Sequence, residues 1–385
     1  MFYVWLGALA ILGGTWAFFL PIAINSGFNK DDDGPVLRQL LIYTVGGILG
    51  VITLGETHRK NNLEKDKNDQ DHARQVHAER RSRYTKAIEH LFNENISIRL
   101  GGVYTLTGLA DEWLSDEKTL RNEKERRKET QNIINNLCTY IRSPFPLAER
   151  AEQLDKDYAK DLQNDFGGDI EKFDTDKQVL ARDKATLEEE RQVRESIIKE
   201  IRERLQDFGT PGPWSNFDYD FSNAHFFYST VFMNSHFKTS PTFFGATFEE
   251  GANFFGTTFE EGANFVETTF NKAANNESAN FMEATFMKKA HFCLATFTGD
   301  ANFTKATFEE DSNYTGAKDD RFFWTTDANF VGATFNQGAN FSKAIFWTKP
   351  IFNDESYTAR FSNKAKLESY NFQVSHSSPY KIDTE

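Results

Sequence analysis

The sequence has few of the residues that cross-link small domains or hold structural metals. It contains two cysteines, Cys138 and Cys293, among 385 residues. Two thiols can form neither a disulfide framework nor a four-cysteine zinc site, and their scarcity points to a reducing compartment. Methionine (4) and proline (9) are also rare, whereas phenylalanine occurs 38 times. A chain this aromatic is not disordered and has the material for a large core.

Positive charge is also in short supply. Lys and Arg number 44 against 57 Asp and Glu, which gives a net charge of -13, and the mean hydropathy is -0.58. This balance argues against a multi-span membrane protein and against direct nucleic-acid binding. The net charge is -1 over residues 1–55, -4 over residues 56–210 and -8 over residues 211–385.

Two long uncharged and strongly apolar runs lie near the N-terminus. Residues 2–24 form a run of 23 and residues 39–55 a run of 17, where about 20 apolar residues cross a hydrocarbon core as a helix. A cleaved signal peptide is the alternative for the first run, but the run has no basic start and exceeds the usual apolar length of ~7–15 residues. The connector is acidic and the basic residues follow the second run, so the positive-inside rule places the rest of the chain in the cytoplasm. We therefore expect a transmembrane hairpin over residues 1–58 and a two-span membrane protein with a cytoplasmic C-terminal region.

The middle of the chain has a helical pattern. Residues 56–83 alternate in charge, which predicts a solvated helical stalk or a flexible linker. Apolar residues at helical spacing then predict three amphipathic helices. These three stripes run from Tyr84 to Phe92, from Leu100 to Trp113 and from Ile133 to Ile141.

A fourth apolar stripe contains four residues, Ile198, Ile201, Leu205 and Phe208. It fits either a coiled-coil seam or a helix that docks on the next domain, and its short length favours docking. The sequence at 209–213 then marks a domain boundary.

Phenylalanine dominates the C-terminal half, where 29 of the 38 lie in residues 211–385. Aromatics recur there at alternating steps of five and six residues, and most units read Ala-Asn-Phe-x-x or Ala-Thr-Phe-x-x, as over 301–308. This period fits neither a helix nor a flat strand. It indicates a chain that turns a corner once per unit and points one large side chain inward each time.

These units resemble the pentapeptide repeat family, in an eleven-residue variant with phenylalanine at the central position, over about residues 221–361. The resemblance implies a right-handed quadrilateral β-helix with four faces to each coil. Four units take about 22 residues, which gives about six coils and a rod roughly 30 Å long. The sequence Arg-Leu-Gly-Gly-Val-Tyr at 99–104 also resembles a helical module that precedes the repeats in many membrane-anchored members.

Two places disturb the repeat. The regular count puts Asn276 at one inward position and Asp319 at another, and a buried unpaired carboxylate is costly. We therefore predict a local bulge at Asn276 and a protruding loop at Asp319. Residues 214–219 are expected to cap the N-terminal end of the solenoid, and residues 364–372 its C-terminal end.

No catalytic pattern is present among the outward residues. His225, His236 and His291 are predicted to be solvated outward or corner residues. Glu249 and Glu260 lie half a coil apart, on opposite faces, and so cannot form an acid/base pair. The glycine cluster at 46–50 has no phosphate-loop spacing. The sequence thus predicts no enzyme, with no catalytic, cofactor-binding or metal-binding residue and no cofactor.

The predicted fold class is α+β multidomain: two transmembrane helices, a helical middle region and a pentapeptide repeat solenoid. The predicted domains are the hairpin (1–58), the stalk and small helical module (59–210), the β-helix (211–372) and a C-terminal tail (373–385). The expected function is that of a membrane-anchored cytoplasmic scaffold, with the membrane and an unknown protein bound on the solenoid faces as partners. The alternative is a DNA mimic, because some members of the family bind a topoisomerase through an acidic β-helix. Against it stand 13 basic residues among the 21 acidic ones of this half. Signalling or transport through the hairpin is a third reading, for which the uncharged spans offer no pathway.

Overall fold

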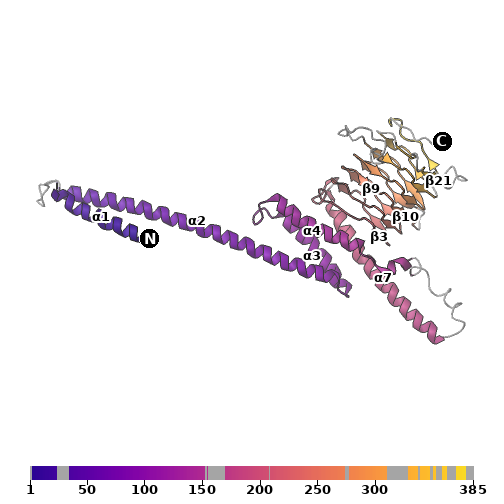
Figure 1. The fold of residues 1–385 in the computed structure, drawn as a ribbon, viewed down its shortest axis with the longest axis horizontal. Helices are drawn as coiled ribbons and strands as arrows, with labels where there is room; N and C mark the ends of the chain where they lie inside the picture. The colour runs from indigo at the N-terminus through magenta and orange to yellow at the C-terminus, as the bar shows by residue number, and fades with distance from the viewer. Residues whose placement is uncertain are drawn as a thin grey trace. The chain divides into compact units, whose positions relative to one another are not determined.

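The computed structural model describes residues 2–23, 34–151, 154, 170–207, 209–273, 277–309, 328–336, 339–346, 350–352, 358–361 and 370–378. The chain divides into two compact units, Met1–Glu79 and Arg80–Glu385. Figure 1 shows the helices and strands of both units. This single division is coarser than the four regions predicted from the sequence, whose boundaries remain predictions.

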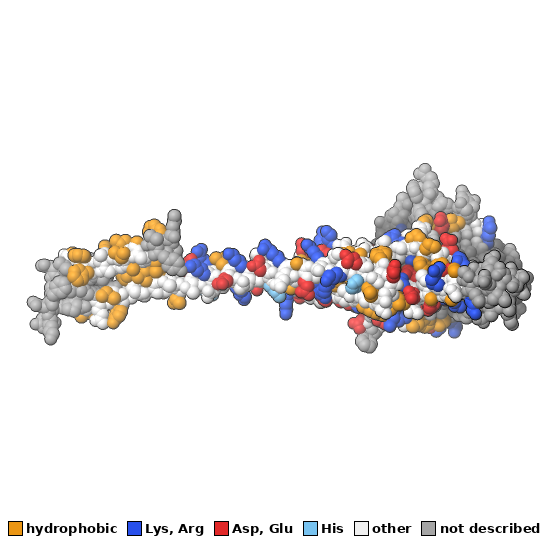
Figure 2. Space-filling model, turned by 90° about the horizontal axis from the view of Figure 1, so that it is seen from below, with side chains coloured by type: hydrophobic (Ala, Val, Ile, Leu, Met, Phe, Trp, Pro, Cys, Tyr) orange, Lys and Arg blue, Asp and Glu red, His pale blue; other side chains and the backbone are white. Residues whose placement is uncertain are grey.

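The first unit is helical. It contains α1 (Phe2–Ala23) and most of α2 (Gly34–Leu91). Pro35 lies in the first turn of α2, where its missing N–H needs no partner. The two helices approach closely at Gly13, where any side chain would collide with Val45. Figure 2 shows hydrophobic side chains gathered over α1 and the start of α2, and side chains of both charges farther along α2. The charged segment at 56–83 is therefore helical rather than a flexible linker.

The prediction of two transmembrane helices is wrong. Among the described residues, no helix combines the length and the apolar character that a membrane crossing requires. Such a crossing takes about 20 consecutive apolar residues, and the second uncharged run instead forms one stretch of the 58-residue helix α2. The prediction of a two-span membrane location with a cytoplasmic C-terminal region is overturned with it. The bounds of residues 1–58 as a region and the membrane as a partner are not tested by the structure.

The second unit begins with a small helical module. After the end of α2 come α3 (Ile96–Ser115), α4 (Glu123–Arg142), the short 3-10 helix η1 (Pro146–Arg150) and α7 (Ile170–Arg204). Asn95 caps α3 by accepting a 2.8 Å hydrogen bond from the Ser97 N–H. The predicted apolar stripes form the core of the module, with Leu106 and Leu137 fully buried. Phe92 and Tyr104 are exceptions, at 70% and 51% exposed, and α2 ends one residue before Phe92.

Helix α7 docks on its neighbours, as its apolar stripe predicted. Ile198, Ile201 and Leu205 are buried, with exposed fractions of 3%, 0% and 0%. The helix packs against α3, α4 and β4 (Thr230–Val231), the first strand of one solenoid wall. Phe208 lies outside the described residues.

The solenoid has four walls of short parallel strands, which stack side by side in Figure 1. The chain passes through walls 1, 2, 3 and 4 in turn, so walls 1 and 3 are opposite each other. Wall 1 contains β3 (His225–Phe226), β6 (Thr247–Phe248), β10 (Thr269–Phe270), β14 (Thr296–Phe297), β18 (Thr334–Phe335) and β21 (Arg360–Phe361). Wall 2 contains β4, β7 (Ala252–Asn253), β11 (Glu277–Asn280), β15 (Asp300–Asn302), β19 (Ala339–Asn340) and β22 (Tyr370–Asn371).

Wall 3 contains β5 (His236–Phe237), β8 (Thr258–Phe259), β12 (Thr285–Phe286), β16 (Thr307–Phe308) and β20 (Ile345–Phe346). Wall 4 contains β9 (Ala263–Asn264), β13 (Ala290–His291) and β17 (Ala328–Asn329). It is extended by isolated bridges, including one between Thr242 and Asn264. Before the first coil, β1 (Gln206–Asp207) and β2 (Thr210–Pro211) form an antiparallel pair.

The phenylalanines fill the interior, as the repeat predicted. Thr247 pairs with Thr269, four repeat units farther along the chain, so each regular coil has the predicted length. Phe254 stacks on Phe281 with ring centroids 5.0 Å apart and an angle of 2° between the planes. Phe265 meets Phe281 edge-on at 5.3 Å and 80°. Both arrangements are favourable for aromatic rings, and these rings are fully buried.

The corners explain why asparagine recurs in the repeat. The Asn280 side chain accepts a 3.0 Å hydrogen bond from the Met282 N–H, and Asn253, Asn264, Asn302, Asn329 and Asn340 do the same in their units. The residue two places after the phenylalanine has a positive φ, 58° at both Glu283 and Leu294. The Phe281 carbonyl accepts from the Ala284 N–H at 3.1 Å and closes the turn. A positive φ at the third position of such a turn is typical of type II.

Both irregularities of the repeat coincide with inserted chain. Ala252 pairs with Ala279, which lies farther along the chain than a regular coil would reach, and the register of β11 shifts between Glu277 and Ala279. This shift confirms a bulge. Ala290 pairs with Ala328, so the second irregular coil contains a still longer insertion. Asn276 and Asp319 themselves lie outside the described residues.

The N-terminal cap is confirmed. Trp214 and Tyr219 are buried, and Tyr219 packs edge-on against Phe237 at 5.4 Å. Most of the predicted C-terminal cap lies outside the described residues, although Phe372 stacks on Phe341 at 6.0 Å.

Candidate interaction surface

The helical module holds the first coil through polar contacts. Asp111 of α3 accepts from the Trp214 indole N–H at 2.9 Å and pairs with Arg204 Nε at 2.8 Å. The Arg204 guanidinium also lies over the Trp214 ring, 5.0 Å from its centroid. On the other side, Arg142 of α4 pairs with Asp220 at 2.7 Å. The module and the first coil therefore meet through specific, directional contacts.

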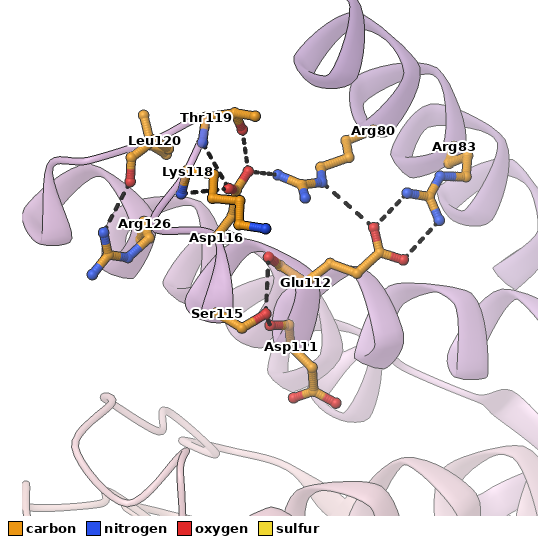
Figure 3. Close-up of polar contacts among 10 residues, drawn as sticks. All are labelled: Arg80, Arg83, Asp111, Glu112, Ser115, Asp116, Lys118, Thr119, Leu120 and Arg126. Atoms are coloured by element: carbon orange, nitrogen blue, oxygen red, sulfur yellow. Dashed lines mark hydrogen bonds and ion pairs between the residues drawn. The ribbon is translucent and has the colours of Figure 1, made fainter. Parts of the chain in front are cut away.

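A second set of contacts joins the last turns of α2 to α3 (Figure 3). Arg83 binds both carboxylate oxygens of Glu112, at 2.9 and 2.5 Å, and this hydrogen bonding lowers the pKa of Glu112. Arg80 Nη1 lies 2.6 Å from Asp116 Oδ2. Burial raises the pKa of Asp116, but hydrogen bonds from Thr119 and Arg80 outweigh it, so the net shift is downward. Both carboxylates are thus engaged in structural contacts.

Inside the module, a buried ion pair joins α7 to α3 and α4. Arg194 is 2% exposed, and its Nε lies 2.7 Å from Glu190 Oε1. Arg99 Nη1 lies 2.6 Å from Glu190 Oε2, to which the Tyr140 hydroxyl also donates at 3.0 Å. Arg194 donates to the Ile141 carbonyl at 2.7 Å. Burial raises the pKa of Tyr140 to about 12. This network links the helices on which the solenoid rests, and within it only the buried Arg99 Nε has no hydrogen-bond partner among the described residues.

On the solenoid, ion pairs link one coil to the next. His225 Nε2 lies 2.9 Å from Glu249 Oε1 on wall 1, and His236 Nε2 lies 2.5 Å from Glu260 Oε1 on wall 3. The hydrogen bond from His225 is the main cause that lowers the pKa of Glu249. The prediction that Glu249 and Glu260 lie on opposite faces is confirmed. The sequence analysis missed the histidine partners of these glutamates. Each histidine precedes its glutamate by one coil plus two residues, whereas the sequence analysis compared only glutamates half a coil apart.

His291 does not behave as predicted. It is 8% exposed, and burial, with a smaller effect of the Lys289 charge, lowers its pKa to about 4. The prediction of a solvated side chain is therefore wrong for His291. The side chains of His225 and His236 are partly exposed, at 34% and 17%.

The two thiols lie in different environments. Cys138 is buried in the helical module, which raises its pKa to about 12, and Cys293 is partly exposed. Within the described parts of the chain, no group of three or more His, Cys, Asp or Glu is arranged to hold a metal ion.

Hollows lie on the described surface of the second unit, and two of them are considered in turn. One of about 310 Å³ lies between the end of α2 and α4, beside Tyr84 and Asn136. The other, of about 400 Å³, lies between α7 and wall 2, and we call it the α7 groove. Apolar Leu100 and Val231 line it together with Lys199 and Arg202. Glu195 and the polar Gln192, Ser196 and Ser229 also line it, so the groove has a mixed lining with charges of both signs.

Comparison with known proteins finds no match for this chain. No family model matches it, and no curated protein or solved structure is significantly similar to it. The functional argument therefore depends on the geometry of the walls and of the α7 groove.

Proposed function

We propose that the protein is a non-enzymatic scaffold that binds a partner protein on its solenoid, and that the solenoid is a right-handed quadrilateral β-helix of the pentapeptide repeat family. The observation that supports this most directly is the continuous stack of buried phenylalanine rings inside the solenoid. Phe254, Phe281 and Phe303 form one continuous stack with 5.0 Å spacings, so successive coils of wall 2 are packed on one another without a gap in the column. A preorganised surface loses little conformational entropy on binding, which favours association.

The outward side chains suit protein contact. Thr247, Thr269 and Thr296 form a half-buried row on wall 1, and they are short and uncharged. Short polar rows of this kind let a partner backbone approach closely, and the corners supply charged groups for orientation. The walls therefore offer flat surfaces with charged borders.

The DNA-mimic alternative is less well supported. It requires acidic groups that face solvent without compensation, as phosphates do. On the described coils, several glutamates are paired with cations of a neighbouring coil, for example Glu261 with Lys288 at 2.5 Å and Glu283 with Lys305 at 2.6 Å. Such pairing reduces the negative potential of the surface.

Photo-crosslinking of the full-length chain in its native cells tests the scaffold proposal. A crosslinking amino acid is placed singly at Thr269, Asn280, Thr285 or Asn264, which puts one probe on each of walls 1 to 4. We expect one protein to be captured from one wall or two adjacent walls, with the remaining positions as internal controls. Capture from no wall, or equal capture of the same abundant proteins from all four, would contradict a specific binding face.

A further inference from the structure

The hollow between the end of α2 and α4, which we call the α2–α4 hollow, lies within the helical module. Its volume of about 310 Å³ is near the lower end of the range for small-molecule sites, ~300–1,000 Å³. Its apolar lining comes from three helices: Tyr84 of α2, Trp113 of α3 and Ile133 of α4. Trp113 and Ile133 are only 5% and 1% exposed, so the base of the hollow belongs to the packed core of the module. The hollow therefore has a firm base and room for a small ligand.

One hydrogen-bond donor and one acceptor in this lining have no protein partner. The Asn136 amide nitrogen donates to the Tyr84 hydroxyl oxygen at 2.7 Å and to the Asn132 carbonyl at 2.8 Å. Both amide hydrogens are therefore used, and the Tyr84 hydroxyl acts as an acceptor. No described residue accepts the hydroxyl hydrogen of Tyr84 or donates to Asn136 Oδ1. A neighbouring donor and acceptor are thus left to a ligand or to water.

Two opposite charges also line the α2–α4 hollow. Of the three arginines in this part of α2, Arg80 and Arg83 hold carboxylates of α3 (Figure 3). Arg81 instead lines the hollow and forms no ion pair with any described residue. Glu129 of α4 lines it as well, and it too has no cation among the described residues. The two helices on either side of the hollow therefore contribute a cation and a carboxylate that do not neutralise each other.

We propose that the α2–α4 hollow binds a free α-amino acid with an apolar side chain. Its carboxylate pairs with Arg81, whose planar guanidinium suits a bidentate contact, and accepts from the Tyr84 hydroxyl. Its ammonium group pairs with Glu129 and donates to Asn136 Oδ1. The side chain packs against the apolar lining at Ile133. Single unpaired charges are ordinary on a helix surface, whereas this hollow joins two of opposite sign to a free donor, a free acceptor and an apolar base.

This site is independent of the scaffold function, because no wall of the solenoid takes part in it. A ligand that contacts α2 and α4 together binds only the folded module. Its binding therefore stabilises the module as the ligand concentration rises above the dissociation constant. The α7 groove is the competing location, since it too contains an acid, Glu195, and an arginine, Arg202.

Titration calorimetry of the full-length protein with each standard L-amino acid, at millimolar concentrations, tests the assignment. The tightest binder is then compared with its N-acetyl derivative, which lacks the positive charge, and with its amide, which lacks the negative charge. These analogues test the zwitterion requirement on the unaltered protein, so the result does not depend on the folding of any variant. The variants are Arg81→Gln and Glu129→Gln. Arg202→Gln is the matched control, because it removes an arginine from the α7 groove.

We expect at least one apolar amino acid to bind, and both of its analogues to bind at least tenfold more weakly. Arg81→Gln and Glu129→Gln should each weaken binding at least tenfold, and Arg202→Gln should bind as the unaltered protein does. The assignment is overturned if no apolar amino acid binds, if either analogue binds as well as the free amino acid, or if Arg81→Gln or Glu129→Gln leaves the affinity unchanged. Loss of binding in Arg202→Gln would place the ligand in the α7 groove and overturn the assignment as well.

Discussion

Replacement of Phe281 by alanine probes the aromatic stack at its centre. The Phe281 ring is fully buried and lies 5.0 Å from the Phe254 and Phe303 rings in its own column. It also meets Phe265 and Phe292 edge-on at 5.3 Å. The neighbouring rings are held by the backbone ladders of their own coils, so they cannot move in to fill the space.

The expected loss follows from this geometry. A buried Phe→Ala change costs about 3–5 kcal/mol, and the upper part of that range applies where the cavity cannot collapse. Since about 1.4 kcal/mol corresponds to a factor of ten, amide protection in the affected coils should fall by roughly two to three and a half orders of magnitude. In a repeat protein, each coil depends mainly on its direct neighbours. The loss should therefore be largest in the coils that contain Phe254, Phe281 and Phe303.

Hydrogen exchange measured by mass spectrometry on the full-length chain resolves these coils separately. Phe92→Ala is the matched control, because Phe92 is 70% exposed and its removal should change stability by less than about 0.5 kcal/mol. Phe281→Leu, which keeps more of the volume, should cost less than alanine does. The reasoning is refuted if Phe281→Ala lowers protection less than tenfold, or if it lowers protection in α4 as much as in the coils.

Three further changes test other parts of the second unit. Glu190→Leu leaves Arg194 buried without its carboxylate and should destabilise the helical module by about 3–5 kcal/mol; Glu203→Leu, at an exposed position of the same helix, should cost less than about 1 kcal/mol by thermal unfolding. The pKa of His291 is lowered to about 4 in the folded protein, so between about pH 6.5 and 4 only the unfolded state binds the proton. The free energy of unfolding should fall over that window as the pH drops, by roughly 3 kcal/mol at most. Urea unfolding at several pH values measures this dependence, and the free energy of unfolding of His291→Gln should depend less on pH. Leu294 has a φ of 58°, which costs a non-glycine residue about 1 kcal/mol. Leu294→Gly should therefore increase the protection of its coil from hydrogen exchange, and Leu294→Val should decrease it. The opposite order would contradict the turn assignment.

The sequence predicted the architecture of the solenoid because one side chain per unit dominates its packing. Phenylalanine at steps of five and six defined the coil length and the inward positions, and the position of Trp214 after a Gly-Pro segment defined the cap. The stripe containing Ile201 predicted docking because a buried face must have a neighbour. These features depend on local spacing, which a sequence displays directly.

The contacts of the candidate site could not be predicted in the same way. The pairing of His225 with Glu249 depends on which residues lie above each other in successive coils, and a comparison of positions one coil apart would have shown it. The burial of His291 depends on its surroundings in three dimensions, which no local pattern describes. The predicted membrane helices were wrong because an uncharged run in the sequence does not define the helix that contains it.

The two inserted segments have a consequence for engineering. Register resumes after each of them, since Ala252 still pairs with Ala279 and Ala290 with Ala328. The stack of rings passes the insertions unbroken, as Phe292 lies 5.1 Å from Phe330. The number of residues between two coils can therefore vary while the distance between their stacked rings stays the same. Foreign loops of different lengths can therefore be inserted at the corners of this solenoid without disturbing the stack of buried phenylalanine rings.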